Sequence, residues 1–205
     1  MKNFLKSLLG NKKNQNENKN ANDKYKYLPK KDELVEERFT KNFSDNGGKF
    51  LYASSKEECN DFYKKILEEN YWNEKSILCF DEKIINDFLN DVDIDINKTN
   101  LNSNLFITSC EFLVAKDGSI LVSAHQIKSY KVKDIPRNII VLAKTSQLSE
   151  TVSKGLEGIR IKYSNNLPSN ITSIKNFNFE ENEKLNFLTY GTSSKNLYLI
   201  LLEDL

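Results

Sequence analysis

The chain has 205 residues, of which 39% are hydrophobic and 29% are charged, and its formal net charge is +1. This length allows one ordinary domain whose core needs neither disulfides nor a structural metal. The charge is uneven, because residues 1–31 carry +7 and residues 32–205 therefore carry about −6. An acidic body argues against a nucleic-acid-binding domain, which is normally basic, so no nucleic-acid partner is expected.

The three cysteines, Cys59, Cys79 and Cys110, lie far apart in the sequence and form no CxxC motif. This spacing argues against a zinc site and against a self-contained iron–sulfur cluster. We therefore expect no resident metal or cofactor. Free thiols are typical of a reducing compartment and predict a cytoplasmic location. No apolar run approaches the roughly 18 residues of a membrane span, so no span is expected.

Residues 1–31 are expected to form a flexible basic segment ahead of the folded domain, which we place at residues 32–205. Residues 11–27 are rich in Asn and Lys and nearly free of aliphatic side chains, so they cannot offset the entropy lost on ordering. The apolar residues between Phe4 and Leu9 have helical spacing. They suit either a helix that docks on a partner or a membrane surface, or a frayed terminus.

The first half of the domain has clear helix and strand signals. Apolar residues at every fourth position from Val35 to Phe43 predict a helix, and Gly47-Gly48 end it. Ser55–Glu58 has the pattern of a capping box and opens a second helix. The further elements expected here are a strand at 49–53, a strand at 76–80, a helix at 82–89, a strand at 105–109, and a hairpin formed by 112–115 and 120–123.

The second half contains the run Asn138–Ala143, which is apolar without alternation and predicts a strand covered on both faces. Thr145-Ser146 is expected to cap the helix that follows it. The remaining expected elements are that helix, with Leu148, Val152, Leu156 and Ile159, and strands at 170–174 and 196–202. This alternation predicts an α/β fold: an open mixed, largely parallel sheet with helices on both faces and the hairpin near its centre.

Ligands of open α/β sheets bind beyond the carboxyl ends of the strands. Three segments with small hydroxyl residues are expected to converge there: Asp117-Gly118-Ser119, Thr145-Ser146, and a loop with Gly191, Thr192, Ser193 and Lys195. Free N–H groups in such segments suit a phosphate or carboxylate, so the expected ligand is a small anionic metabolite. The alternatives are structural, since Asp-Gly is a common hairpin turn and a polar loop often precedes a terminal strand.

Glu111 is the candidate catalytic residue, either as a nucleophile or as a general base with a raised pKa. The alternative is a solvated glutamate at a strand edge. His125 is the only histidine in the chain, which invites a catalytic role. Nothing marks Asp134, its nearest following acid, as an orienting partner, so we interpret His125 as structural. Cys110 follows an apolar run and is expected to be a buried, inert thiol.

Four stretches carry the pattern of a known family. They are Asn46–Glu58, between two helices; Glu111–Leu121, an apolar strand with a glycine-centred turn; Pro136–Leu142; and Tyr190–Leu202, a loop with a closing strand. Together, over about residues 32–205, they resemble the LUD domain, the family of the C-type lactate-utilisation subunit. The family's Thr-Gly-Thr turn is Asp117-Gly118-Ser119 here, and its His-Gly-Pro loop is Tyr190-Gly191-Thr192. The chain is therefore similar to a divergent branch of the family.

The resemblance implies a fold similar to the sugar-phosphate isomerase and CoA-transferase group. It also implies association with iron–sulfur oxidoreductase subunits that oxidise L-lactate, or a related hydroxy acid, to pyruvate. The chain would then be a non-redox accessory subunit. Two alternatives stay open. One is a stand-alone enzyme or binding protein for a small phosphorylated or CoA-linked metabolite, with Glu111 in its site, and the other is an interaction module tethered by residues 1–31.

Overall fold

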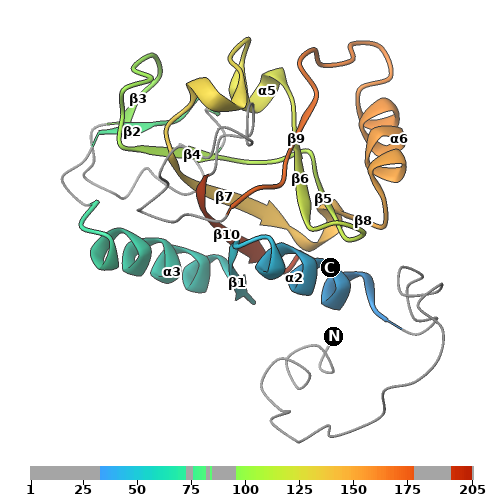
Figure 1. Cartoon of the computed structure of the whole chain (residues 1–205), viewed down its shortest axis with the longest axis horizontal. Helices are drawn as coiled ribbons and strands as arrows, with labels where there is room; N and C mark the ends of the chain where they lie inside the picture. Colours follow the sequence, from blue (N-terminus) through green and yellow to red (C-terminus); the bar gives the residue numbers. More distant parts are fainter. Residues whose placement is uncertain (1–32, 73–75, 82–83, 85–95, 178–194, 205) are drawn as a thin grey trace, which may run out of the picture.

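The computed structural model describes residues 33–72, 76–81, 84, 96–177 and 195–204. Over these residues the chain forms two β-sheets with helices packed around them (Figure 1). The basic segment 1–31 and the loop residues Gly191, Thr192 and Ser193 lie outside the described residues. The same is true of the helix expected at 82–89, apart from Ile84.

The described helices are α2 (Val35–Asp45), α3 (Lys56–Glu69), α5 (Ala124–Ile127) and α6 (Val152–Lys162), with short 3-10 turns at Val132–Asp134 and Thr145–Gln147. The strands of the main sheet are β1 (Lys49–Ala53), β2 (Ile77–Leu78), β3 (Ile96–Asn97), β4 (Leu105–Thr108), β7 (Asn138–Lys144) and β10 (Asn196–Leu202). The strands of the second sheet are β5 (Phe112–Val114), β6 (Ser119–Val122), β8 (Leu148–Ser149) and β9 (Thr172–Ile174).

The main sheet is parallel throughout, in the order β1-β10-β7-β4-β2-β3. Its apolar strand β7 contains the run that the sequence predicts to be covered on both faces, and Ile139–Ala143 are all buried. Parallel strands need crossover connections, which place helices over the faces of the sheet. The predicted α/β class with a largely parallel sheet is confirmed.

Different helices cover the two faces of this sheet. Side chains of β7 alternate between them, so Ile140 packs in the cluster with α3, and Ile139 packs in the cluster with Phe39 and Phe43 of α2. The two phenylalanine rings stack with their centroids 5.4 Å apart, and both are fully buried. Each buried ring of this size contributes about 1.5–3 kcal/mol through removal from water. Both helices thereby fix the sheet that carries the site.

The hairpin of β5 and β6 lies in the second sheet, in the order β8-β5-β6-β9, and not near the centre of the main sheet as expected. Strand β8 occupies the free edge of β5, and β9 occupies the free edge of β6. Neither hairpin strand therefore has an edge left to pair with β4. Leu113 and Ile120 of the hairpin join the cluster around α2, so the second sheet helps to cover one face of the main sheet.

The segment after β7 also differs from the expectation that Thr145-Ser146 cap a long helix. Those residues form only a 3-10 turn, and Leu148 pairs with Leu113 as part of β8. Helix α6 begins later, where the Thr151 hydroxyl accepts a hydrogen bond from the Lys154 N–H at 3.2 Å. The strand pairing of Leu148 overrides its helical spacing, because the hairpin offers it a partner edge.

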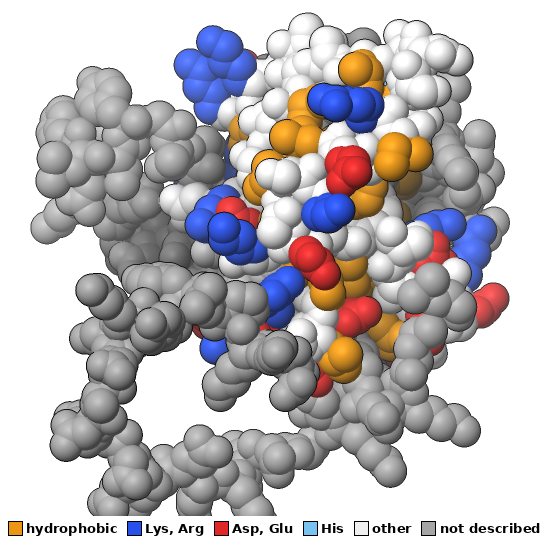
Figure 2. Space-filling model, turned by 90° about the vertical axis from the view of Figure 1, so that its right-hand side faces the viewer, with side chains coloured by type: hydrophobic (Ala, Val, Ile, Leu, Met, Phe, Trp, Pro, Cys, Tyr) orange, Lys and Arg blue, Asp and Glu red, His pale blue; other side chains and the backbone are white. Residues whose placement is uncertain are grey.

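The face seen from the α6 side carries apolar side chains interspersed with basic and acidic ones (Figure 2). Helix α6 itself has three exposed apolar residues, Val152, Leu156 and Ile161. Over the described ranges, every helix is too short or too polar to cross a bilayer.

Candidate functional site

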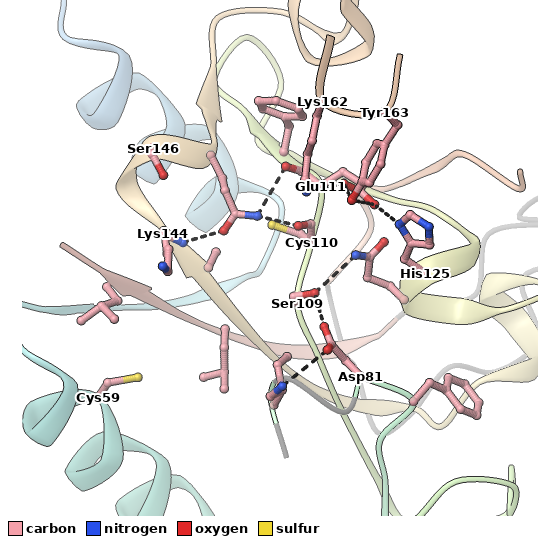
Figure 3. A pocket seen from close by; sticks show the side chains of 18 of the residues that line it. Cys59, Asp81, Ser109, Cys110, Glu111, His125, Lys144, Ser146, Lys162 and Tyr163 are labelled. Atoms are coloured by element: carbon pink, nitrogen blue, oxygen red, sulfur yellow. Dashed lines mark hydrogen bonds and ion pairs between the residues drawn. The ribbon is translucent and has the colours of Figure 1, made fainter. Parts of the chain in front are cut away.

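A pocket of about 910 Å³ opens beyond the carboxyl ends of β2, β4, β7 and β10 (Figure 3). This is the edge at which open α/β sheets bind ligands. Segments far apart in the sequence supply its polar lining: Lys56, Asp81, Ser109, Glu111, His125, Gln126, Lys128, Lys144, Ser146, Gln147, Lys162 and Tyr163. Its apolar lining includes Cys59, Phe80, Ile84, Cys110, Phe112, Leu142, Ala143 and Leu202.

Glu111 is the centre of the polar side of the pocket. It follows β4, and its backbone N–H donates to the carbonyl of Leu121 at 2.8 Å, which links the site to the hairpin. The carboxylate is fully buried. Three side chains donate hydrogen bonds to it: the Ser123 hydroxyl at 2.7 Å, the Lys162 ammonium at 3.1 Å and the Tyr163 hydroxyl at 3.1 Å. Nδ1 of His125 lies 3.4 Å from the same carboxylate. Figure 3 shows Lys162, Tyr163 and His125 gathered around it.

These contacts make Glu111 a fixed anion. Burial alone raises the pKa of its carboxyl, but hydrogen bonds from Ser123 and Lys162 outweigh burial and hold the pKa below its ordinary value. The pKa of Lys162 moves in the complementary direction: burial lowers it, but its bonds to Tyr163 and Glu111 raise it overall. A general base with a raised pKa, as considered from the sequence, is therefore not supported at Glu111, and neither is a solvated edge position.

The close approach of α6 to the hairpin brings Lys162 and Tyr163 over Glu111. A Cβ on Gly158 would overlap the ring of Phe112, and a Cβ on Gly155 would lie 2.7 Å from a methyl carbon of Leu121. Glycine at both positions lets the helix lie directly on β5 and β6. Ile159, directly after Gly158, is buried against the hairpin, so the last turn of α6 is held at the pocket.

His125, interpreted from the sequence as a structural residue, also belongs to this cluster. It lies in α5, whose capping residue Ser123 accepts the His125 backbone N–H at 3.2 Å. The imidazole packs edge-on against Tyr163, with 4.8 Å between ring centroids, and 47% of the side chain is exposed. The acid beside it is Glu111, which precedes it in the sequence, and not Asp134. The thirteen residues between Glu111 and His125 contain the hairpin, which brings the two side chains together in a way that the linear sequence does not reveal.

A chain of hydrogen bonds continues from Glu111 across the pocket floor. The Ser123 backbone N–H donates to the Gln126 side-chain oxygen at 2.9 Å, and the Gln126 amide donates to the Ser109 hydroxyl at 3.3 Å. Ser109 in turn donates to Asp81 at 2.9 Å. Ser109, Gln126 and Asp81 were not among the sequence candidates, because each is a common residue type whose role depends on the fold.

The lining of the pocket carries a surplus of positive charge. Four lysines, Lys56, Lys128, Lys144 and Lys162, stand against the two carboxylates of Asp81 and Glu111. Lys128 also has φ 54°, which is uncommon for a residue other than glycine. Its ammonium lies 6.0 Å from the centre of the Phe80 ring. The pocket is therefore suited to an anion.

The thiols of the pocket are not activated. Cys110 is buried, and burial raises the pKa of its thiol far above the ordinary range. Burial likewise raises the pKa of Cys59 to about 11. Both sulfurs are therefore protonated near neutral pH, in agreement with the inert thiol expected for Cys110. In the part of the chain that the structure describes, no cluster of His, Cys, Asp and Glu is arranged to hold a metal ion.

Among the expected ligand residues, Ser146 lines the pocket and Thr145 lies beside it. The hydrogen-bond donors of Thr145 and Ser146 are already bonded to an acidic side chain, Asp204. The Asp204 carboxylate accepts hydrogen bonds from the Thr145 hydroxyl at 2.8 Å, from the Ser146 N–H at 2.9 Å and from the Ser146 hydroxyl at 2.7 Å. Burial raises the pKa of Asp204, but the bonds from Ser146 outweigh burial and lower it. Thr145-Ser146 therefore binds an anionic group, as expected, but this group is the carboxylate of Asp204 from the same chain.

The turn Asp117-Gly118-Ser119 packs against α2 and does not line the pocket. The Asn46 side chain donates to the Asp117 carbonyl at 2.7 Å, and Asp117 accepts from the Ser119 hydroxyl at 2.7 Å. Gly118 has φ 68°, and a Cβ there would overlap the backbone of Asn42. This turn connects the second sheet to α2.

Lys195 lies at the opposite end of the main sheet, because it precedes β10 and the pocket follows the strands. Its buried ammonium donates to the carbonyls of Ile135 at 2.8 Å and Pro136 at 3.4 Å. Burial and, to a smaller extent, the nearby charge of Arg137 lower the pKa of Lys195 to about 8. The described members of the three expected segments therefore do not converge, and only Thr145-Ser146 reaches the pocket.

Comparison with known proteins identifies the family. Residues 36–202 match the LUD domain, which is most of the chain. The chain belongs to the LUD domain family. Membership associates it, at the level of the family, with lactate-utilisation systems. No curated protein matches the sequence.

The fold of this LUD domain protein is similar to a crystal structure of a DUF162 family protein from Deinococcus radiodurans. The TM-score is 0.60 at 15% sequence identity, and the match covers 83% of this chain and 96% of the other. At this identity the likeness concerns the fold alone.

Proposed function

We propose that this LUD domain protein binds a small anionic metabolite in the pocket beyond the carboxyl ends of its main sheet. We further propose that it serves as a non-redox accessory subunit in the cytoplasmic oxidation of L-lactate, or of a related hydroxy acid, to pyruvate. Iron–sulfur oxidoreductase subunits would be its partners. The observation that carries the proposal is the lysine-rich pocket at the ligand-binding edge of a LUD fold.

The charge balance of the pocket supports an anionic ligand. Lys56, Lys128, Lys144 and Lys162 line the pocket beside the carboxylates of Asp81 and Glu111. The negative carboxylate of a hydroxy acid gains from these ammonium groups in a partly enclosed site, where electrostatic interactions are stronger than in bulk water. Glu111 is fully buried and accepts hydrogen bonds from three side chains, so it fixes the neighbouring pocket residues and is not exposed for attack on a ligand.

The thiols support a non-redox role for this chain. Iron–sulfur clusters bind cysteine thiolates, whereas burial raises the pKa of Cys59 and of Cys79 to about 11. Electron transfer in the proposed system would therefore lie in the partner subunits.

Isothermal titration calorimetry of the full chain tests ligand binding against L-lactate, glycolate, pyruvate, sugar phosphates and CoA esters. We expect saturable binding of at least one anion, weakened about tenfold by Lys144→Gln, which corresponds to about 1.4 kcal/mol. Lys154→Gln, an exposed lysine of α6 paired with Glu157 outside the pocket, is the matched control. Absence of binding by every anion, or equal loss in the control, would contradict the proposed site.

Co-purification and reconstitution test the role as a subunit. A tagged full chain expressed with iron–sulfur oxidoreductase subunits of a lactate-utilisation system should retain them, and lactate-dependent reduction of an electron acceptor should fall when the chain is omitted. An assembly that oxidises lactate equally well without this chain would rule out the accessory role while leaving the ligand site untouched.

A second candidate function is binding or conversion of a phosphorylated or CoA-linked metabolite. The size of the pocket favours it, because about 910 Å³ is near the upper end of the roughly 300–1,000 Å³ usual for drug-sized ligands. A three-carbon acid would leave most of that volume to water. In the same calorimetric panel, a phosphorylated or CoA-linked ligand that binds much more tightly than L-lactate would favour this second function.

A further inference from the structure

We infer that Lys162 and His125 form a two-pronged cationic clamp for the anionic group of the ligand, with Glu111 as the positioning residue that sets its geometry. The inference rests on the proposed function, since it assigns part of the same pocket to the carboxylate or phosphate of its ligand. It names which side chains receive that group and makes binding dependent on the protonation of one of them.

The first argument is geometric. Lys162 and His125 both contact the Glu111 carboxylate, on Oε2 and Oε1 respectively, and both line the pocket. Glu111 is fully buried, whereas Lys162 is 50% exposed and His125 is 47% exposed. The carboxylate thus anchors one side of each cation and leaves its remaining surface open. Cations held this way before a ligand arrives lose little side-chain entropy on binding.

The second argument concerns the rigidity of the supporting side chains. Tyr163 donates to Glu111 and packs against the imidazole of His125, with 4.8 Å between ring centroids. It also lies under the Lys162 ammonium, 4.7 Å from the ring centre to Nζ. Ser123 caps α5 and bonds to Glu111, so the backbone of His125 is fixed to the same anion. The buried carboxylate of Glu111 therefore fixes the positions of both cationic side chains, Lys162 and His125.

The third argument concerns charge. Glu111 faces His125 from the segment after β4, and Tyr163 faces it from the end of α6, where Lys162 shares the same carboxylate. Lys128, at the C-cap of α5, lines the same pocket. With neutral His125, Lys162 and Glu111 cancel, but protonated His125 gives the group a net positive charge. An anion should therefore bind more tightly to the form with protonated His125, and by linkage the bound anion should favour that form.

His125 is the only histidine in the sequence, so its imidazole gives an unambiguous NMR signal in the intact chain. We propose titrations with sodium sulfate and with sodium L-lactate, because the charge of either anion is constant across the range in which histidine titrates. Sodium chloride at equal ionic strength controls for screening. Sulfate should shift the His125 ring signals saturably and should bind more tightly at acidic than at alkaline pH.

Variants separate the clamp from a purely structural cluster. Lys162→Gln should weaken sulfate binding about tenfold, equivalent to about 1.4 kcal/mol. Lys162→Arg should restore most of it, and Lys154→Gln should leave it unchanged. His125→Gln should retain weaker binding without pH dependence between about pH 5.5 and pH 8. Each variant is compared only if its circular dichroism spectrum matches the wild type.

The inference is overturned if sulfate and L-lactate leave the His125 signals unmoved, or if Lys162→Gln binds both as well as the wild type. Its failure is distinguishable from failure of the proposed function. A panel ligand that binds through Lys144 without moving the His125 signals would refute the clamp alone. A clamp that binds sulfate while every panel metabolite fails would instead refute the proposed metabolite class.

Discussion

Replacement of Glu111 by glutamine tests whether this residue anchors the site. The substitution keeps the size of the side chain but converts one acceptor oxygen into a donor amide. Ser123 can redirect its hydroxyl to Gln126, whose oxygen is 3.1 Å away. Lys162 and His125 can turn to water, because each is about half exposed. Tyr163 loses its charged acceptor, and the buried amide of the new residue faces other donors.

These losses set the expected magnitude. A hydrogen bond to a charged group contributes about 1.5–3 kcal/mol, and a buried donor left unsatisfied costs about 1–3 kcal/mol. The half-exposed ion pairs with Lys162 and His125 add little, as surface pairs contribute about 0–1 kcal/mol. We therefore expect Glu111→Gln to lower the free energy of unfolding by about 3 kcal/mol. In a chain of this size that change lowers Tm by roughly 6–12 °C.

Urea denaturation at several pH values measures this effect. The pKa of Glu111 is lowered in the folded state, so its stabilisation is complete above the unfolded-state pKa of about 4.3 and is lost as pH falls through the folded-state pKa. The difference between wild type and variant should therefore be constant near neutral pH and shrink below about pH 4.

The matched control is Glu157→Gln, an exposed glutamate of α6 paired with Lys154, which should change stability by less than about 0.5 kcal/mol. A Glu111→Gln protein as stable as the wild type at pH 7 would refute the reasoning that this carboxylate organises the site.

Three further predictions concern the framework. Gly118→Ala should lower the free energy of unfolding, measured by urea denaturation, by at least about 3 kcal/mol. A positive φ alone costs about 1–3 kcal/mol, and the new Cβ would also clash with the α2 backbone. A smaller loss would contradict the packing of this turn against α2. Gly158→Ala gains up to about 1 kcal/mol of helix propensity. The clash of the new methyl group with Phe112 should nevertheless lower the free energy of unfolding by about 1–3 kcal/mol and displace the His125 NMR signals. Unchanged signals would contradict the close approach of α6 to the hairpin. Between about pH 8 and 10.5 the unfolded state keeps the Lys195 proton more readily than the folded state, so the contribution of Lys195 to stability should grow with pH. The stability difference between wild type and Lys195→Met should therefore move in favour of the wild type across this range, because the opposing contribution of the buried thiols is common to both proteins.

Local signals in the sequence predict much of the main sheet. The unbroken apolar run of β7 can only be a strand covered on both faces, and the four-residue spacing from Val35 to Phe43 matches α2. The second sheet was missed because its strands find partners across long stretches of chain, as when Ile120 pairs with Ile174. Leu148 is a single-residue example of such long-range pairing, because the free edge of β5 outweighs the helical spacing of Leu148 in the sequence.

The sequence predicts where the candidate site lies in the fold but not which residues form it. The rule that ligands bind beyond the carboxyl ends of parallel strands points to the edge at which the candidate pocket lies, and Glu111 lines that pocket. Its partners Lys162 and Tyr163 are about fifty positions away on α6, and no local pattern distinguishes them from surface residues. Lys195 was misplaced because it precedes its strand, and residues that precede a parallel strand lie at the amino edge.

The position of β10 has a consequence for how the protein folds. It follows every other described strand of the main sheet in sequence, yet it lies between β1 and β7. Synthesis from the N-terminus therefore produces β1 long before the strand that joins it to the rest. Until residues 196–202 emerge, β1 and β7 each present an unpaired edge, and such edges promote aggregation and slow folding. Chaperone dependence during synthesis should therefore be concentrated in the interval before β10 inserts.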